Sequence, residues 1–125
     1  MARKGINSPH LTTPVGPYSH AVQAEEFVYL SGQTAQDQQT GKLLEGDVSA
    51  QTEQVFANLK VVLEAVGKSF ADVVKCNVFL VDMTDFAAMN AVYAQQFEAP
   101  FPARSTVAVA ALPLGARVEI ELVAH

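Results

Sequence analysis

Several residue types are scarce in this 125-residue chain, and their scarcity excludes whole classes of protein. It has one cysteine, Cys76, and charged residues make up only 17% of it, against about 25% in typical soluble domains. A single thiol forms no internal disulfide and no cysteine metal cluster, so we expect a reducing compartment. Half of the residues are hydrophobic, yet no apolar run approaches the roughly 20 residues of a membrane-spanning helix.

Basic residues are also few. Eight Lys and Arg stand against thirteen Asp and Glu, which gives a net charge of −5. Binding to nucleic acid usually requires a basic patch that displaces phosphate counterions, so no nucleic-acid partner is expected. The low charge content also favours an oligomer, because a lone small domain has much surface to cover with polar groups.

No pattern for binding a cofactor or a metal is present. The chain lacks a glycine-rich phosphate-binding loop and a Gly-x-Ser-x-Gly elbow. Its histidines, His10, His20 and His125, are far apart and lack metal-ligand spacing. The polar residues after Met1 do not resemble a signal peptide. We therefore expect a cytoplasmic protein that uses no cofactor and no metal.

Hydrophobic periodicity predicts one domain over residues 1–125, with an irregular arm over 1–17. Apolar residues recur at helical spacing in two segments, and β-branched or alternating residues mark the strands. The strands are predicted at 19–23, 27–31, 73–81, 103–111 and 117–124, and the helices at 48–66 and 85–97. Asp47 or Ser49 is expected to cap the first helix, and Gly67 fits the position just past its end.

The predicted order is ββαβαββ, an α/β (α+β) fold with a mixed sheet. Strands that alternate with helices imply parallel crossovers, and the short turn near Pro113 implies a final antiparallel hairpin. One face of the strand at 73–81 is expected to carry Val74, Cys76, Val78 and Leu80. Two helices on one face of the sheet would leave the other face bare, and self-association would cover it.

Arg104 and Glu119 are the charged residues most suggestive of chemistry. Arg104 begins a strand after Phe101-Pro102-Ala103, where a guanidinium could grip a carboxylate with two parallel hydrogen bonds. Glu119 faces away from its apolar neighbours, and a carboxylate on a partly buried sheet can act as a base. The alternative for each is a solvated side chain on a strand.

Four segments resemble the RidA/YjgF family, the reactive intermediate deaminases that are also called L-PSP endoribonucleases. Together they cover nearly the whole chain in the family's order. They are Gly16-Pro17-Tyr18-Ser19, Leu30-Ser31-Gly32-Gln33, Asn77 to Met83 with Phe86 and Asn90, and Pro102 to Val107 continuing to Val118-Glu119-Ile120-Glu121.

The resemblance implies a chorismate-mutase-like fold, assembled as a homotrimer whose sheets enclose a central barrel. Each active cleft would then lie between neighbouring subunits. The implied activity is hydrolytic deamination of imines and enamines of 2-oxo acids, such as 2-aminoacrylate and 2-iminopropanoate, to a 2-oxo acid and ammonia. A small imino or 2-oxo acid would be the ligand.

Site residues follow from the resemblance, position by position. Arg104 would bind the substrate carboxylate, and Glu119 would position the attacking water. The substrate-binding set is Tyr18, Ser31, Asn90, Arg104 and Thr106. Some members have Cys where Thr106 stands, so no thiol role is carried over.

Two other classes of function remain open. One is a ribonuclease or translation inhibitor, a role described for some members of the family, which the acidic charge opposes. The other is a module that binds small carboxylates without turning them over. Arg104 fits both a binder and an enzyme, whereas Glu119 favours the enzyme. The physiological substrate is also open, and the alternatives include a specialised imine of a catabolic pathway.

Overall fold

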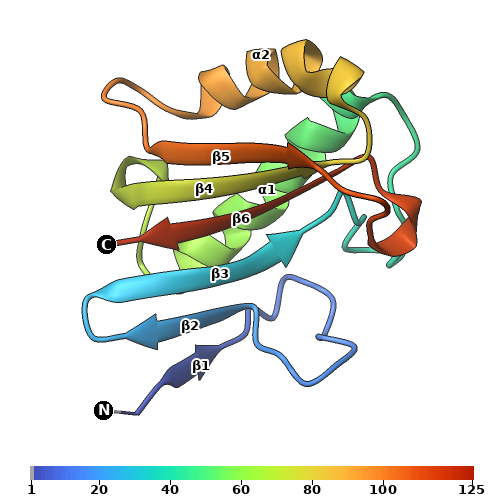
Figure 1. Ribbon diagram of the computed structural model, residues 1–125. Helices are drawn as coiled ribbons and strands as arrows, with labels where there is room; N and C mark the ends of the chain where they lie inside the picture. The colour runs from blue at the N-terminus through green and yellow to red at the C-terminus, as the bar shows by residue number, and fades with distance from the viewer. Residues whose placement is uncertain (1) are drawn as a thin grey trace.

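The computed structural model describes residues 2–125, which form a six-stranded sheet and two α-helices (Figure 1). Three short 3₁₀ turns link them. In chain order the strands and helices are β1 (Lys4–Ile6), β2 (Ala21–Ala24), β3 (Phe27–Gln33), α1 (Val48–Ala65), β4 (Val73–Leu80), α2 (Phe86–Gln96), β5 (Ala103–Ala108) and β6 (Val118–Ala124).

The strand order in the sheet is β1-β2-β3-β6-β4-β5. β4 and β5 are parallel neighbours joined through α2, as the crossover pattern predicts. β6 is antiparallel to both β3 and β4 and lies between them. The predicted final hairpin is therefore wrong, because β4 separates β5 from β6. Strand β6 gains two hydrogen-bonded neighbours in this position, which a terminal hairpin at the sheet edge would not provide.

The predicted order ββαβαββ lacks one strand. Residues 4–6 lie in the segment expected to be an irregular arm, yet they pair with β2, with Lys4 opposite Gln23. The observed order is βββαβαββ. A three-residue strand is too short to display an alternating pattern, so only its pairing partner defines it.

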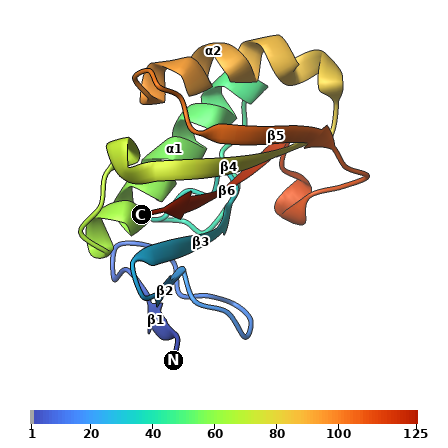
Figure 2. The same ribbon diagram turned by 60° about the vertical axis from the view of Figure 1, so that its left-hand side comes forward.

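Both helices pack on the same face of the sheet, as predicted (Figure 2). α1 begins where the Asp47 carboxylate accepts the backbone N–H of Ala50 at 2.9 Å. It ends before Gly67, whose φ of 72° lies in the left-handed region that glycine adopts without strain. The predicted cap and stop of this helix are confirmed.

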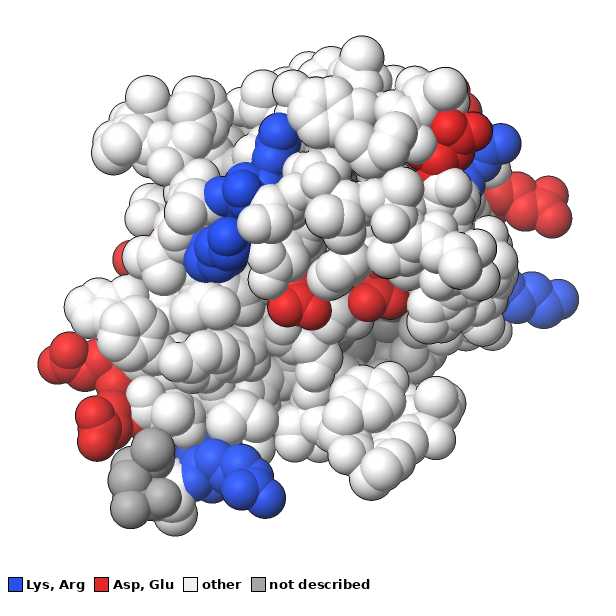
Figure 3. All heavy atoms as spheres, viewed as in Figure 1, with Lys and Arg blue, Asp and Glu red and all other residues white. Residues whose placement is uncertain are grey.

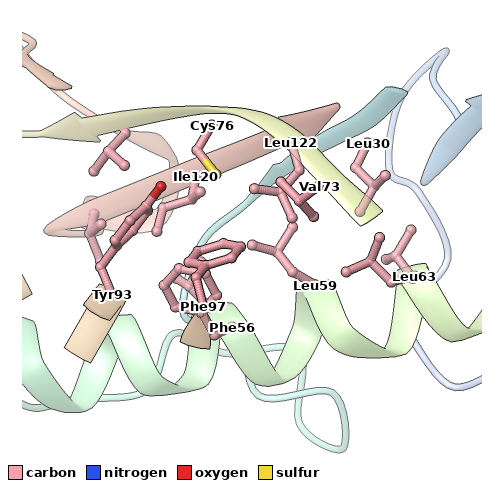
Figure 4. Close-up of a cluster of buried hydrophobic side chains, with 14 of the residues drawn as sticks. Leu30, Phe56, Leu59, Leu63, Val73, Cys76, Tyr93, Phe97, Ile120 and Leu122 are labelled. Atoms are coloured by element: carbon pink, nitrogen blue, oxygen red, sulfur yellow. The ribbon is translucent and has the colours of Figure 1, made fainter. Parts of the chain in front are cut away.

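The core lies between this face and the helices (Figure 4). Cys76, Ile120 and Leu122 enter it from the sheet, while Phe56 and Tyr93 enter it from α1 and α2. Burying a side chain such as Phe56, Ile120 or Leu122 stabilises the fold by roughly 1.5–3 kcal/mol.

Val74 does not share the buried face of β4, contrary to the prediction. It is 43% exposed, whereas Val73 and Cys76 are buried. The register between β4 and β6 shifts between Val73 and Lys75, and this irregularity breaks the alternation expected of a flat strand.

The opposite face of the sheet is not covered by any helix of residues 2–125 (Figure 3). Uncharged side chains predominate on it, and two acidic side chains lie side by side near its centre. Tyr29 and Val107 are about half exposed there. The trimer and its central barrel remain predictions. No helix in the described part of the chain has the length and apolar character needed to cross a membrane.

Candidate active site

Arg104 lies on the edge strand β5 and points to the helical side of the sheet. It pairs in register with the buried Cys76, so the two side chains share a face. Its Nη1 donates a hydrogen bond to Oδ1 of Asn90 on α2. The guanidinium carbon lies 4.6 Å from the ring centroid of Tyr93 and 5.5 Å from that of Phe86. α2 therefore contacts Arg104 through an amide and two aromatic rings.

An open pocket of about 400 Å³ adjoins this guanidinium. Asn90, Tyr93, Ala94, Phe101 and Pro102 line it together with Arg104. Within residues 2–125, no carboxylate lies within 4.0 Å of Arg104. A half-buried guanidinium with free donors and no anionic partner is suited to binding a carboxylate from solution.

Two buried hydroxyls lie near Arg104 without a hydrogen-bond partner in the described chain, those of Thr106 and Tyr93. Thr106 is two residues along β5 and therefore on the same face as Arg104. Burial, and next the adjacent Cys76 thiol, raise the pKa of Tyr93. Burial likewise raises the pKa of Cys76, so this thiol is protonated and unreactive at neutral pH, as expected of a core cysteine.

Glu119 lies in a different cleft, of about 350 Å³, at the start of β6. The cleft is also lined by Tyr18, His20, Gly32 and Leu114. Burial, and next the charge of Glu121, raise the pKa of Glu119. A carboxylate with a raised pKa binds a proton more readily, which favours its use as a general base.

Gly32 allows the Glu119 carboxylate to lie close to the backbone of β3. A Cβ at this position would lie 2.5 Å from Oε2 of Glu119 and 2.9 Å from its Cδ. The register of β3 against β6 shifts between Leu30 and Gln33, so Gly32 lies at an irregularity of the sheet. Such irregularities often border functional sites, where they change the direction of a side chain.

Hydrogen bonds fix the chain behind this cleft. The Ser31 hydroxyl donates to the carbonyl of Ser19 at 2.7 Å. His20 is buried, and its Nδ1 accepts the backbone N–H of Ser8 at 3.0 Å, so its Nε2 is the nitrogen that donates to the carbonyl of Thr12 at 2.9 Å. His20 therefore has a structural role and holds the segment that carries Tyr18.

The structure brings the predicted site residues together in two groups. Arg104, Asn90 and Thr106 lie at the α2 side of the sheet. Tyr18 and Glu119 line the second cleft, and Ser31 adjoins it. Glu119 pairs with Phe79, on the face opposite to that of Val78 and Cys76. Within one chain the two groups therefore lie on opposite faces of the sheet.

The contact of Tyr93 with Arg104 was not predicted from the sequence. Phe86, Asn90 and Tyr93 are spaced i, i+4 and i+7, which places all three on one helix face. This spacing, together with the resemblance that singled out Asn90, was the available signal. Gly32 was noted only as part of a motif, because nothing local indicates that Glu119 lies against it.

No group of three or more His, Cys, Asp or Glu side chains that could hold a metal occurs among residues 2–125. The polar groups near Arg104 and Glu119 are a guanidinium, amides, hydroxyls, the His20 imidazole and one carboxylate. This set suits the orientation of a small carboxylate and the activation of a water.

The sequence and fold of this chain match those of known proteins. The family model described as Endoribonuclease L-PSP matches residues 8–125. A 2-iminobutanoate/2-iminopropanoate deaminase of Dermatophagoides farinae is 48% identical over 93% of this chain and 91% of its own length. RidA from an Antarctic Psychrobacter species is 47% identical, with a TM-score of 0.92 over 98% of both chains. Escherichia coli TdcF, solved with bound serine, is 38% identical, with a TM-score of 0.90 over 97% of both chains. The chain belongs to the RidA/YjgF family.

Proposed function

We propose that this protein hydrolyses imines and enamines of 2-oxo acids to the 2-oxo acid and ammonia. The observation that carries the proposal is Arg104, a half-buried guanidinium fixed by Asn90 and facing an open pocket, with no carboxylate partner in residues 2–125. Relatives of the same family bear the name 2-iminobutanoate/2-iminopropanoate deaminase. The bound serine of TdcF is a small molecule with a carboxylate, which is the kind of ligand that Arg104 would hold.

In the proposed reaction Arg104 binds the substrate carboxylate through two parallel hydrogen bonds. An enamine first takes a proton at carbon and becomes the imine. Glu119 accepts a proton from a water as that water attacks the imine carbon, and the resulting carbinolamine loses ammonia to leave the 2-oxo acid. Because a protonated imine is already electrophilic, orientation and one activated water supply the chemistry.

We further propose a homotrimer in which Arg104 of one subunit and Glu119 of its neighbour meet in one site. The two groups lie on opposite faces of the sheet within a chain, so one substrate cannot touch both there. In a head-to-tail ring, each interface joins one surface of a subunit to a different surface of its neighbour, so the Arg104 face of one can meet the Glu119 face of the next. The bare sheet face and the low charge content support this assembly.

A direct test is a coupled assay in which a pyridoxal-phosphate dehydratase releases 2-aminoacrylate. The expected result is that the protein accelerates formation of pyruvate and ammonia above the rate in buffer. A rate equal to that in buffer, with binding of 2-oxo acids intact, would favour a carboxylate-binding module instead.

The family's description as an endoribonuclease supplies a second candidate. The net charge of −5 opposes it, because RNA binding draws on basic surface. A further purification step would remove trace nuclease from the same preparation. After that step, RNA-cleaving activity is expected to disappear and imine hydrolysis to remain. RNA cleavage that persists and depends on Arg104 would support the second candidate.

A further inference from the structure

We infer that Tyr93 is a positioning residue that fixes the plane of the Arg104 guanidinium, and that it thereby sets the preference of this site for a carboxylate. Phe86 assists it from the preceding turns of α2. This inference deepens the proposed function, because it concerns the group that would hold the substrate. Tyr93 does not act on the reacting atoms in this scheme and works through Arg104.

The first support is the contact itself. The Tyr93 ring centroid is 4.6 Å from the guanidinium carbon and that of Phe86 is 5.5 Å away. Both distances fall within the range of about 6 Å in which an aromatic ring attracts a cation. A guanidinium held against two rings has less freedom to rotate, and Asn90 also holds it through Nη1.

The second support is that the Tyr93 ring is itself immobile. It is only 5% exposed, and it packs against Phe97 and Phe56 with ring centroids 4.9 Å and 5.8 Å away. Tight packing in the core holds such rings in one rotamer. A ring fixed by the core can transmit that rigidity to Arg104, as a precise site requires.

The third support is what remains free on Arg104. A guanidinium has five N–H donors, and Asn90 takes one at Nη1. The Tyr93 hydroxyl has no hydrogen-bond partner among the described residues, so it takes none of the others. The remaining donors therefore stay available for a carboxylate.

The test compares three variants by two readouts that need no turnover. Tyr93→Leu removes the ring beside the guanidinium and keeps apolar bulk, and Tyr93→Phe restores the ring. Phe70→Leu is a matched control in the same aromatic cluster, where the Phe70 ring packs against Phe56 and Phe97 with centroids 5.7 Å and 5.6 Å away. The first readout is the Kd of 2-oxobutanoate, with uncharged 2-oxobutanamide as reference. The second is the NMR signal of the Arg104 side-chain N–H, which is assigned by its loss in Arg104→Lys. An aromatic ring shifts the signal of a proton above its face upfield.

Tyr93→Leu is expected to weaken 2-oxobutanoate binding about 2- to 30-fold, the range that a cation–π contact supports. It should also move the Arg104 signal downfield, while binding of the amide changes little. Tyr93→Phe should recover the wild-type Kd to within about twofold. Phe70→Leu should leave both readouts at wild-type values although it lowers the melting temperature.

The inference fails if Tyr93→Leu leaves both readouts unchanged, or if Phe70→Leu weakens binding as much as Tyr93→Leu does. Should Tyr93→Leu not fold, Phe86→Leu gives the same test with a smaller expected loss, because its ring is farther from the cation. A wild-type protein that binds 2-oxobutanoate but hydrolyses no imine would remove the proposed function and leave this inference intact.

Discussion

Mixing two inactive variants tests whether the site is shared between subunits. Arg104→Ala keeps Glu119, and Glu119→Gln keeps Arg104. If each site takes its arginine from one chain and its carboxylate from the next, a mixed ring contains sites in which both groups are intact. If instead each chain carried a complete site, no mixture could contain one.

The expected magnitude follows from the geometry of a ring. In a random one-to-one mixture, the chain that supplies the arginine is intact with a chance of about one half, and so is its neighbour that supplies the carboxylate. About a quarter of the sites therefore regain both groups. Each variant alone should retain far less, because loss of a buried charged contact costs about 2–5 kcal/mol, or roughly 30- to several-thousand-fold in rate.

The assay is imine hydrolysis by the two variants co-expressed in one cell, each with a different affinity tag, and purified through both tags in turn. Variants purified separately and mixed without subunit exchange are the control and should stay inactive. Selection through both tags removes unmixed rings, so at least a quarter of the wild-type rate per chain is expected. Activity no higher than the mean of the two variants would refute the shared site.

Four further outcomes are expected. Sedimentation equilibrium should give three times the chain mass of 13.4 kDa, and a clean monomer would contradict the assembly. Glu119→Gln should lower kcat by about 10²–10⁴-fold while changing 2-oxo acid binding little. Because burial raises the pKa of Glu119, the wild-type kcat/KM should fall at acid pH with an apparent pKa above the ordinary carboxyl range. An apparent pKa at the ordinary value would contradict this. The same raised pKa means that ionised Glu119 destabilises the fold, so Glu119→Gln should raise the melting temperature at pH 7, a gain that disappears below about pH 4. Gly32→Ala should displace the Glu119 carboxylate and reduce kcat without unfolding the chain, and unchanged kcat would show that the close approach is dispensable.

Local patterns predicted the helices and most strands of this fold. Asp47 and Gly67 give α1 a defined start and end, and alternation marks Val118 to Leu122 as a half-buried strand. The position of β6 between β3 and β4 was not predicted, because strand pairing depends on residues distant in sequence. β1 was missed for the same reason.

The site was predicted in part. The order of motifs marked Arg104 and Glu119, but nothing in a linear pattern indicates that they face opposite sides of the sheet. Tyr93 shows why the remainder was missed. One side of its ring packs in the core and another side contacts Arg104, and helical spacing reports only the first.

The proposed role of Arg104 is tested most directly by comparing wild type with Arg104→Ala and Arg104→Lys on a carboxylated imine and on an imine that lacks the carboxylate. Wild type should strongly prefer the carboxylated imine. Arg104→Ala should lose about 30- to several-thousand-fold on it and change little on the neutral imine. Arg104→Lys should recover little, because an ammonium cannot form the planar pair of hydrogen bonds. Hydrolysis of the carboxylated imine by Arg104→Ala at close to the wild-type rate, in a protein with wild-type sedimentation, would contradict the carboxylate-binding role of Arg104.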